Sequence, residues 1–326
     1  LARRDDRARA APPLRRVSVP PGAQVAPHAS ASAVLGVRGR GRASRHGPSG
    51  FAVEGRVTAT AFPRGQLFLI AGPCVVEHDD LMFRVGDHLA RLAERVPGGI
   101  LFKASFDKAN RSNAGAARGP GLDEGLAALA RVRARTGLPV VTDVHLPEQC
   151  APAAEVADVL QIPAFLCRQT DLLEAAGATG KPVNIKKGQW MHPEGLVGAV
   201  AKVRGAAPAG TPVAVTERGT FFGYGDLVVD VRSFPRLREA CDAPVIFDAT
   251  HSVQRPGQGS GGTSGGAREF IPPLAMAACA AGVDGLFMET HPDPARSPSD
   301  GPNMIPLDAL DALIARCVAV WETARG

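Results

Sequence analysis

The feature that most constrains this chain is a regular alternation of short apolar runs with longer amphipathic stretches, from about residue 65 to the C-terminus. Each run is mostly aliphatic, as expected for a strand whose two faces are both buried in a parallel sheet. Eight runs can be counted, which predicts eight strands. They are residues 67–71, 100–103, 139–143, 158–162, 182–186, 212–216, 244–248 and 283–288.

The stretches between these runs carry the period of amphipathic helices. Apolar residues recur every three or four positions over residues 79–96 and again over residues 307–321, which predicts a helix in each segment. Gly-Leu-Pro at 137–139 and Asp-Ala-Pro at 242–244 each indicate a helix end followed by a strand start. The eight units predict an α/β fold, a (β/α)₈ TIM barrel over residues 65–326, with a doubly wound open sheet as the alternative.

Composition decides what kind of protein can carry this pattern. Hydrophobic residues make up 45% of the chain and aromatic residues only 5%, so the chain can bury a large, mainly aliphatic core. No apolar run approaches the roughly 18 residues that span a membrane, which excludes a membrane helix. The six cysteines form no CxxC pair, so we expect reduced thiols in a cytoplasmic protein, with Cys279 and Cys317 in the core.

Residues 1–64 differ from the rest of the chain in charge. They contain twelve Arg, no Lys and three acids, a formal charge of +9, so the remaining residues carry −4 of the total of +5. The mildly acidic remainder excludes nucleic acid as the partner of the folded part. Residues 1–64 show no sustained helical or strand period, so we expect an extension outside the barrel. It is an organelle transit peptide, a disordered basic arm, or an upstream stretch foreign to the native protein, since Leu1 stands first.

In a (β/α)₈ barrel the functional groups stand at the carboxyl ends of the strands, where the loops to the helices begin. In this sequence those ends are polar, whereas strand starts such as Ile100, Pro139 and Pro182 carry no chemistry. Polar groups at one rim of an apolar barrel indicate an enzyme rather than a binding scaffold. In strand order they are Cys74, Lys103 with Ser105, Asp143 with His145, Gln161, Lys186 with Lys187, Glu217 with Arg218, Asp248 with His251, and Glu289 with His291.

Part of this rim is cationic. So many positive groups in an otherwise acidic domain indicate a substrate with more than one anionic group, such as phosphate or carboxylate. A single lysine is more often a solvated surface charge, but Lys103 and Lys186 close apolar strands, where an exposed position fits poorly. The cationic residues are Lys103, Lys108, Arg111, Lys186 and Arg218, with Ser105 and Ser112 as hydroxyl donors.

A second part of the rim offers ligands for a metal ion. Its thiol, imidazole and two carboxylates suit a divalent ion such as Zn²⁺, Fe²⁺ or Mn²⁺. No local spacing supports the set, and a core role for Cys74 with a turn role for Asp300 is the competing interpretation. In a closed barrel, however, the first strand adjoins the eighth and the eighth adjoins the seventh, which brings three of the four together. The four candidates are Cys74, His251, Glu289 and Asp300.

A glycine-rich segment covers residues 255–267 and precedes a helical pattern. Its backbone amides suit an anion, and a mobile lid over the site is the alternative interpretation. The sequence contains neither GxxxxGK[ST] nor a GxGxxG motif that follows a strand and opens a βαβ unit, so we exclude nucleotide hydrolysis and hydride transfer on a dinucleotide fold.

Longer motifs stand at the strand ends. They are KASFDKANRS (103–112), RGPGL (118–122), TDVH (142–145), QIPAFLCRQTDLL (161–173), FGYGDLVVD (222–230), DATHSVQ (248–254) and ETHPDP with SDGPNM (289–304). Together they resemble the 3-deoxy-D-manno-octulosonate 8-phosphate synthases, from about residue 66 to the C-terminus. The metal-independent branch of that family has Asn where this chain has Cys74, so the resemblance is to the metal-dependent branch.

The resemblance implies a homotetrameric barrel without a nucleic-acid or membrane partner. It implies condensation of phosphoenolpyruvate with D-arabinose 5-phosphate and water, which yields a lipopolysaccharide precursor and phosphate. It implies that Lys103, Ser105, Lys108, Lys186 and Arg218 hold phosphoenolpyruvate, with Gln161 also in the substrate site. Asn110, Arg111 and Ser112 would hold the sugar phosphate, together with Arg168 of a neighbouring subunit. The catalytic residues would be Lys108, Asp143, His145 and His251, and the metal ligands Cys74, His251, Glu289 and Asp300.

Two alternatives compete with this function. The related synthase that uses erythrose 4-phosphate typically carries KPRTS where this chain carries KANRS, so Asn110 favours the five-carbon sugar. A catalytically silent barrel predicts loss of charged strand ends, and no matched position has lost its charge. One departure from the family is Asn113 in place of a second Ser, which we expect to change the affinity for the sugar phosphate.

Overall fold

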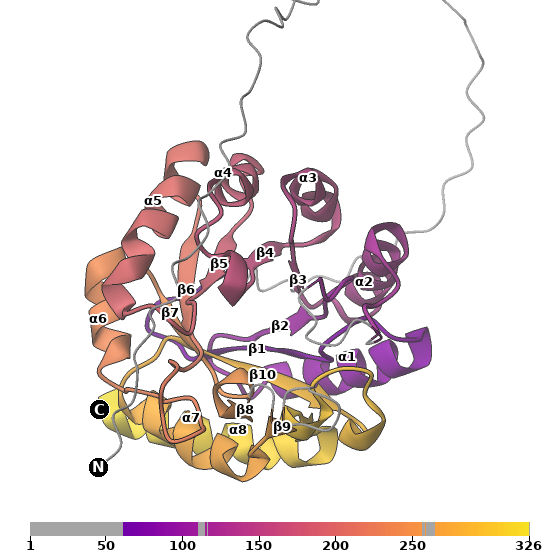
Figure 1. Cartoon of the computed structure of the whole chain (residues 1–326). Coiled ribbons are helices and arrows are strands. Elements are labelled where there is room, and N and C mark those ends of the chain that lie inside the picture. Colours follow the sequence, from indigo (N-terminus) through magenta and orange to yellow (C-terminus); the bar gives the residue numbers. More distant parts are fainter. Residues whose placement is uncertain (1–60, 110–114, 116, 256–257, 259–264, 326) are drawn as a thin grey trace, which may run out of the picture. The chain divides into compact units, whose positions relative to one another are not determined.

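The computed structural model describes residues 61–109, 115, 117–255, 258 and 265–325. Within these residues eight parallel strands close into a barrel surrounded by helices (Figure 1). Because β1 is hydrogen-bonded to both β2 and β10, the sheet closes, and the open-sheet alternative is excluded. The barrel strands are β1 (Phe68–Gly72), β2 (Ile100–Lys103), β3 (Val140–Asp143), β4 (Val159–Ile162), β5 (Val183–Lys186), β6 (Val213–Glu217), β7 (Val245–Asp248) and β10 (Gly285–His291).

Helices form the outer layer of the barrel (Figure 1). They are α1 (Asp79–Ala93), α2 (Leu122–Thr136), α3 (Pro147–Val156), α4 (Thr170–Ala178), α5 (Val197–Ala206), α6 (Ser233–Cys241), α7 (Ile271–Ala280) and α8 (Leu307–Arg325). The loops add the short helices η1 (Ala164–Leu166), η2 (Pro193–Leu196), η3 (His251–Val253), η5 (Arg268–Phe270), η6 (Pro294–Arg296) and η7 (Gly301–Asn303). Two-residue strands also lie in the loops: β8 (Gln254–Arg255), β9 (Gly265–Gly266) and β11 (Ile305–Pro306).

The strand pattern predicted from the sequence is confirmed, since each of the eight predicted runs overlaps a barrel strand. The largest difference is at β10, which was predicted to end at residue 288, where the apolar run ends, but continues to His291. The strand is longer because Thr290 and His291, although polar, pair with β11. Cys279 and Cys317 are fully buried, as predicted. No helix among the described residues is long and apolar enough to cross a membrane.

Both helix ends predicted from short motifs are present. Gly137, with φ of 72°, ends α2 in the left-handed conformation, and Asp242, with φ of 44°, ends α6 in the same way. Glycine adopts this conformation without a steric penalty, whereas Asp242 needs support. The carbonyl oxygen of Asp242 accepts hydrogen bonds from Arg204 and Arg64, which supply that support.

Packing of the barrel extends upstream of residue 65. Phe62 is only 6% exposed, and its ring centroid lies 6.0 Å from that of Phe68 in the barrel interior. The sequence analysis placed residues 61–64 in the N-terminal extension; within them, Phe62 and the partly buried Ala61 pack against the inner core, and the exposed Arg64 donates a hydrogen bond to Asp242. The rest of the predicted extension, residues 1–60, lies outside the described residues.

Alternation along the strands produces two apolar cores, one on each face of the sheet. The outer core packs the strands against the helices. The inner core fills the barrel and includes Leu101, Val141, Val159, Ala214, Ile246 and Phe287. Two positions further along each of these strands, on the same face, the buried side chain is polar: Lys103, Asp143, Gln161, Thr216, Asp248 and Glu289. The inner core therefore ends where the polar rim begins.

Candidate active site

Lys103 lies at the centre of the rim. Its Nζ is 3.0 Å from Glu289 Oε1, 3.4 Å from Asp143 Oδ2 and 3.2 Å from the carbonyl oxygen of Cys74. Burial alone would lower the pKa of Lys103, but Asp143 and Glu289 outweigh it and raise that pKa above its usual range. Burial would raise the pKa of Glu289, but Lys103 and His251 outweigh it and lower that pKa to about 2. Lys103 is therefore a cation and Glu289 a carboxylate at neutral pH.

Lys108 reaches the same two carboxylates from the loop after β2. Its Nζ lies 3.9 Å from both Asp143 Oδ2 and Glu289 Oε1, and 15% of its side chain is exposed. Burial would raise the pKa of Asp143, but Lys103 and Lys108 outweigh it and hold that pKa well below its usual range. Lys108 is thus a partly exposed cation beside two carboxylates, in a position to meet an anion that enters the site.

A close contact between the first two strand ends brings Cys74 to Lys103. A Cβ atom at Gly72 would lie 2.1 Å from the carbonyl oxygen of Lys103, so only glycine allows this approach. Just beyond it, the N–H of Ser105 donates to the carbonyl oxygen of Cys74, and the N–H of Val76 donates to that of Ser105. The loops after β1 and β2 are therefore joined by their backbones.

A chain of side-chain hydrogen bonds crosses four neighbouring strands of the rim. Gln161 Nε2 donates to Asp143 Oδ1 at 2.5 Å, and Asn184 Nδ2 donates to Gln161 Oε1 at 2.9 Å. Thr216 Oγ1 then donates to Asn184 Oδ1 at 2.7 Å, and Ser105 Oγ also donates to Asp143. The sequence prediction missed Asn184 and Thr216, whose only local signal is a polar residue inside an apolar strand.

Asp248 joins Lys186 to His251. Lys186 Nζ donates to Asp248 Oδ2 at 2.5 Å, and His251 Nδ1 lies 2.8 Å from the same oxygen. With the Nδ1–H of His251 donated to the Asp248 carboxylate, the lone pair of the ring lies on Nε2, on the opposite side. Lys186 Nζ also lies 3.5 Å from the centroid of the Phe287 ring, which adds a cation–π contact.

The predicted metal ligands meet at the ends of β1, β7 and β10. Among the described residues, Cys74, Glu289 and Asp300 each bring one ligand atom to within 4.8 Å of the others. His251 Nε2 adjoins them, 3.6 Å from Glu289 Oε2 and 4.0 Å from Asp300 Oδ2. We refer to Cys74, His251, Glu289 and Asp300 as the metal-ligand group.

The chemistry of this group fits a divalent metal ion. Burial and the charge of Glu289 raise the pKa of the Cys74 thiol above its usual range, so the thiol stays protonated unless a cation stabilises the thiolate. Asp300 has φ of 50°, a left-handed conformation that is rare for a residue with a side chain and concentrates at functional sites. Buried sulfur, imidazole and carboxylate donors suit Zn²⁺, Fe²⁺ or Mn²⁺.

Arg218, directly after β6, has one guanidinium nitrogen that could bind a ligand. Its Nη2 donates to Gln254 Oε1 at 2.5 Å and to the carbonyl oxygen of His251 at 3.1 Å. Its Nη1 is buried and has no hydrogen-bond partner in the part of the chain that the structure describes. A buried donor without a partner is costly, so an anion is the natural complement of Nη1. Gln254 was missed by the sequence prediction, although it ends one of the quoted motifs.

The remaining predicted site residues lie at the edge of this cluster, on an exposed loop, or outside the described residues. His145 packs its ring edge-on against Phe106, with centroids 6.1 Å apart, and burial lowers its pKa. Arg168 is exposed in the loop before α4. Asn110, Arg111 and Ser112 lie outside the described residues, as does most of the glycine-rich segment 255–267.

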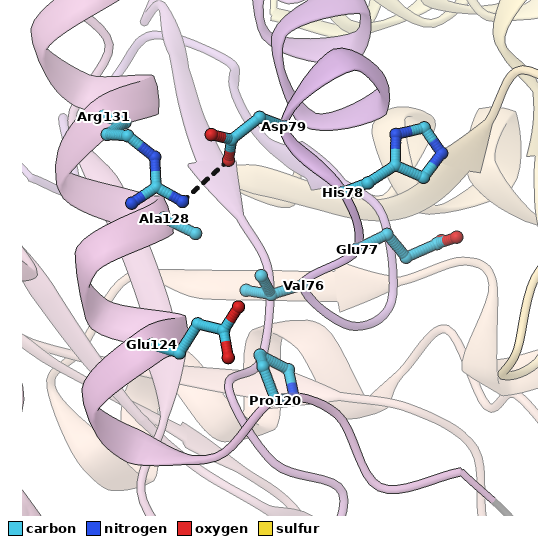
Figure 2. A pocket seen from close by; sticks show the side chains of 8 residues that line it. All are labelled: Val76, Glu77, His78, Asp79, Pro120, Glu124, Ala128 and Arg131. Atoms are coloured by element: carbon cyan, nitrogen blue, oxygen red, sulfur yellow. Dashed lines mark hydrogen bonds and ion pairs between the residues drawn. The ribbon is translucent and has the colours of Figure 1, made fainter.

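A separate pocket lies between the start of α1 and helix α2 (Figure 2). Arg131 of α2 and Asp79 of α1 form an ion pair across the pocket at 2.8 Å, and Glu124 lies on the α2 side with Arg131. Glu77 points away from Glu124 and toward His291, whose Nε2 lies 3.3 Å from Glu77 Oε1. Among the described residues, none of the rim cations or metal ligands lines this pocket, so it is distinct from the candidate active site.

Comparisons with known proteins support the resemblance found in the motifs. A family model described as the DAHP synthetase I family matches residues 63–324. The 2-dehydro-3-deoxyphosphooctonate aldolase of Nitratidesulfovibrio vulgaris is 55% identical over 255 residues, which cover 78% of this chain and 92% of that protein. The enzyme of the same name from Nitrobacter hamburgensis is 56% identical over 260 residues, which cover 79% of this chain and 89% of that protein. The chain therefore belongs to the DAHP synthetase I family and, within it, to the 2-dehydro-3-deoxyphosphooctonate aldolases, the 3-deoxy-D-manno-octulosonate 8-phosphate synthases.

Proposed function

We propose that this chain condenses phosphoenolpyruvate with D-arabinose 5-phosphate and water to give 3-deoxy-D-manno-octulosonate 8-phosphate and inorganic phosphate. The observation that carries the proposal is the gathering of Lys103, Lys108, Lys186 and Arg218 beside the metal-ligand group at one end of the barrel. Two phosphates and a carboxylate need that many donors. The name 2-dehydro-3-deoxyphosphooctonate aldolase, carried by the relatives, supports the same reaction.

The bond changes explain why a cationic site is needed. C3 of phosphoenolpyruvate bonds to the sugar aldehyde carbon, and a water oxygen bonds to C2. The C2–O bond to phosphate then breaks, which leaves a ketone and inorganic phosphate. The phosphate and carboxylate stay anionic throughout, so Lys103, Lys186 and Arg218 serve to bind and orient them, with Ser105 and Gln161 at the edge of the site.

Proton transfers fall to residues beside these cations. Lys108 donates a proton to the aldehyde oxygen as that oxygen becomes a hydroxyl, and Asp143 lies within 4 Å of both Lys103 and Lys108. His145 accepts a proton from the attacking water, because its lowered pKa leaves the imidazole neutral at pH 7. These roles rest on charge and proximity in the rim.

The metal-ligand group would hold one divalent ion, with Zn²⁺, Fe²⁺ and Mn²⁺ as the candidates. The bound ion would polarise the sugar aldehyde or the water beside it. His251 would present Nε2 to the ion, since Asp248 holds its Nδ1. The other three members contribute the Cys74 sulfur and the carboxylates of Glu289 and Asp300.

Removal of the ion tests this part of the proposal. We expect a chelator to abolish most phosphate release, and added divalent ions to restore it. Cys74→Ser removes a direct ligand, so it should weaken metal binding by more than the roughly 10- to 100-fold typical of losing an outer partner, measured as metal content after dialysis. Cys241→Ser, at a buried cysteine of α6, is the matched control and should keep its metal. Full activity in protein shown to be metal-free would contradict the metal assignment.

For the sugar phosphate, we propose Asn110, Arg111 and Ser112, together with Arg168 from a neighbouring subunit of a homotetramer. Arg168 is exposed, and nearby Phe165 and Trp190 are 48% and 42% exposed with ring centroids 5.6 Å apart. An exposed aromatic pair supports a subunit contact there. Light scattering should give the mass of four chains, and Arg168→Ala should raise KM for arabinose 5-phosphate; a monomer with an unchanged KM would refute the assignment.

The substrate itself is tested by phosphate release from phosphoenolpyruvate in the presence of either sugar phosphate. We expect release with arabinose 5-phosphate and little with erythrose 4-phosphate, because of Asn110 in the KANRS motif. Release with erythrose 4-phosphate alone would favour the heptulosonate reaction instead.

We also place the reaction in the cytoplasm, in lipopolysaccharide precursor synthesis. The six buried free cysteines support a reducing compartment.

A further inference from the structure

Gln254 connects two parts of the rim that the proposed reaction uses for different tasks. It lies in β8, directly after the short helix η3 that begins with His251. Its Oε1 accepts from Arg218 Nη2 at 2.5 Å, and its Nε2 donates to Asp300 Oδ1 at 2.9 Å. We propose that Gln254 is a positioning residue that orients the anion-binding Arg218 and the metal ligand Asp300 together. The inference rests on the proposed function, which gives those two residues their tasks.

An uncharged amide is the side chain that suits this position. The amide oxygen can only accept a hydrogen bond, and the NH₂ group can only donate. Arg218 has only donors to offer and the Asp300 carboxylate has only acceptors, so one orientation of Gln254 satisfies both and the flipped amide satisfies neither. A carboxylate at 254 would repel Asp300, and an ammonium would repel Arg218.

The two hydrogen bonds decide which atoms of the partners remain for ligands. With Oδ1 of Asp300 bound to Gln254, Oδ2 is the oxygen that faces Cys74 Sγ at 3.4 Å and His251 Nε2 at 4.0 Å. With Nη2 of Arg218 shared between Gln254 and the His251 carbonyl, Nη1 is left without a partner among the described residues. Gln254 thus directs one oxygen to the metal ion and one nitrogen to the substrate anion.

The two hydrogen bonds of Gln254 join three loops that are far apart in the sequence. Arg218 follows β6 and lies 36 positions before Gln254. Asp300 precedes η7 and lies 46 positions after Gln254, which itself follows η3. Asp300 has the left-handed conformation that needs support from its surroundings. Arg218 keeps a second anchor at the His251 carbonyl, so loss of Gln254 should weaken its placement without abolishing it.

The test is Gln254→Met, which keeps the length of the side chain and removes both hydrogen bonds. Gln258→Met is the matched control, because the Gln258 amide donates to the Gly225 carbonyl at 2.9 Å and contacts neither partner. Metal affinity is measured without turnover, by titrating metal-stripped full-length protein with Co²⁺ and following the absorption of the cobalt–thiolate bond. The use of phosphoenolpyruvate is measured as KM and kcat for phosphate release at saturating metal.

We expect Gln254→Met to weaken Co²⁺ binding by about 10- to 100-fold, as for other outer partners of metal ligands. KM for phosphoenolpyruvate should rise about tenfold while kcat changes less than about threefold, because saturating ligands restore the positions of both groups. Gln258→Met should match the wild type in all three quantities. If the methionine variant does not fold by circular dichroism, Gln254→Leu takes its place.

Three results would overturn the inference: unchanged Co²⁺ affinity, unchanged KM, or a fall in kcat alone, which would indicate an interaction made only in the transition state rather than placement of the ligands. The wild-type chain separates these from failure of the proposed function. If the wild type binds neither Co²⁺ nor phosphoenolpyruvate, the proposed function fails and the inference with it. If the wild type and Gln254→Met bind both equally well, only the inference fails.

Discussion

At the scale of single residues, the balance between burial and neighbouring charge decides each protonation state. For Lys103 the neighbouring carboxylates outweigh burial, and its pKa is raised. For His145 burial outweighs the charges of Asp143 and Asp107, and its pKa is lowered. An unfolded histidine has a pKa of about 6.5, so below that pH the unfolded chain binds a proton that the folded chain does not. The stability contribution of a neutral His145 is therefore present above about pH 6.5 and is lost as the pH falls toward its lower folded-state pKa.

We expect the free energy of unfolding to fall with decreasing pH below about 6.5, with His145 adding up to about 1.4 kcal/mol per pH unit. His145→Gln should flatten this dependence in urea unfolding curves at a series of pH values. A slope in His145→Gln equal to that of the wild type would show that His145 titrates alike in the folded and unfolded states.

At the scale of elements, a buried ion pair joins the end of β5 to the end of β6. Lys187 Nζ is fully buried, lies 3.4 Å from Glu217 Oε1, and donates to the carbonyl oxygens of Gly188 and Met191. The same Glu217 oxygen accepts from the backbone N–H of Arg218 at 3.0 Å. The pair thus holds the loop after β5 against the turn that carries Arg218.

Breaking this pair from one side should cost more than removing both charges. Lys187→Met leaves Glu217 buried without its partner, and we expect a loss of about 3–5 kcal/mol in the free energy of unfolding. The double variant with Glu217→Gln should recover part of that loss. As a control, Arg131→Met breaks the exposed pair with Asp79 and should cost less than about 1 kcal/mol. Urea unfolding measures all three, and a single-variant cost no larger than the control would contradict this account.

At the scale of the whole molecule, the barrel interior needs a residue that precedes its first strand. Phe62 packs on Phe68 within the inner core that otherwise comes from the strands. Deletion of residues 1–60 should leave catalysis and thermal stability unchanged, because Phe62 is retained. Deletion of residues 1–64 removes Phe62 and should cost about 3 kcal/mol or more, as for large-to-small core changes.

Thermal unfolding distinguishes the two truncations. A loss of about 3 kcal/mol corresponds to a fall in Tm of roughly 6–12 °C for a domain of this size. Phe62→Ala in the full chain should reproduce the fall, which separates the lost ring from the lost backbone. Equal melting temperatures for both truncations would mean that Phe62 contributes nothing to the packing.

Local sequence patterns were sufficient for the eight strands and for the position of the polar rim at their carboxyl ends. Burial on both faces makes each strand an apolar run, so eight strands could be recognised without any long-range information. The same period of two carries the inward face from Leu101 to Lys103 and from Phe287 to Glu289, where the apolar core ends. Cys74, Lys103 and Glu289 were therefore predicted at the rim from their strands alone.

Tertiary structure decided what these residues contact. Cys74 and Asp300 are 226 positions apart, and only closure of the barrel between β1 and β10 brings sulfur and carboxylate together. Two features depend on three loops meeting: the amide bridge of Gln254, and the Nη1 of Arg218, which has no partner within the described part of the chain. No local period in the sequence encodes such a meeting. Hydrophobic alternation is a property of neighbours in the chain, whereas hydrogen-bond partners are chosen by neighbours in space.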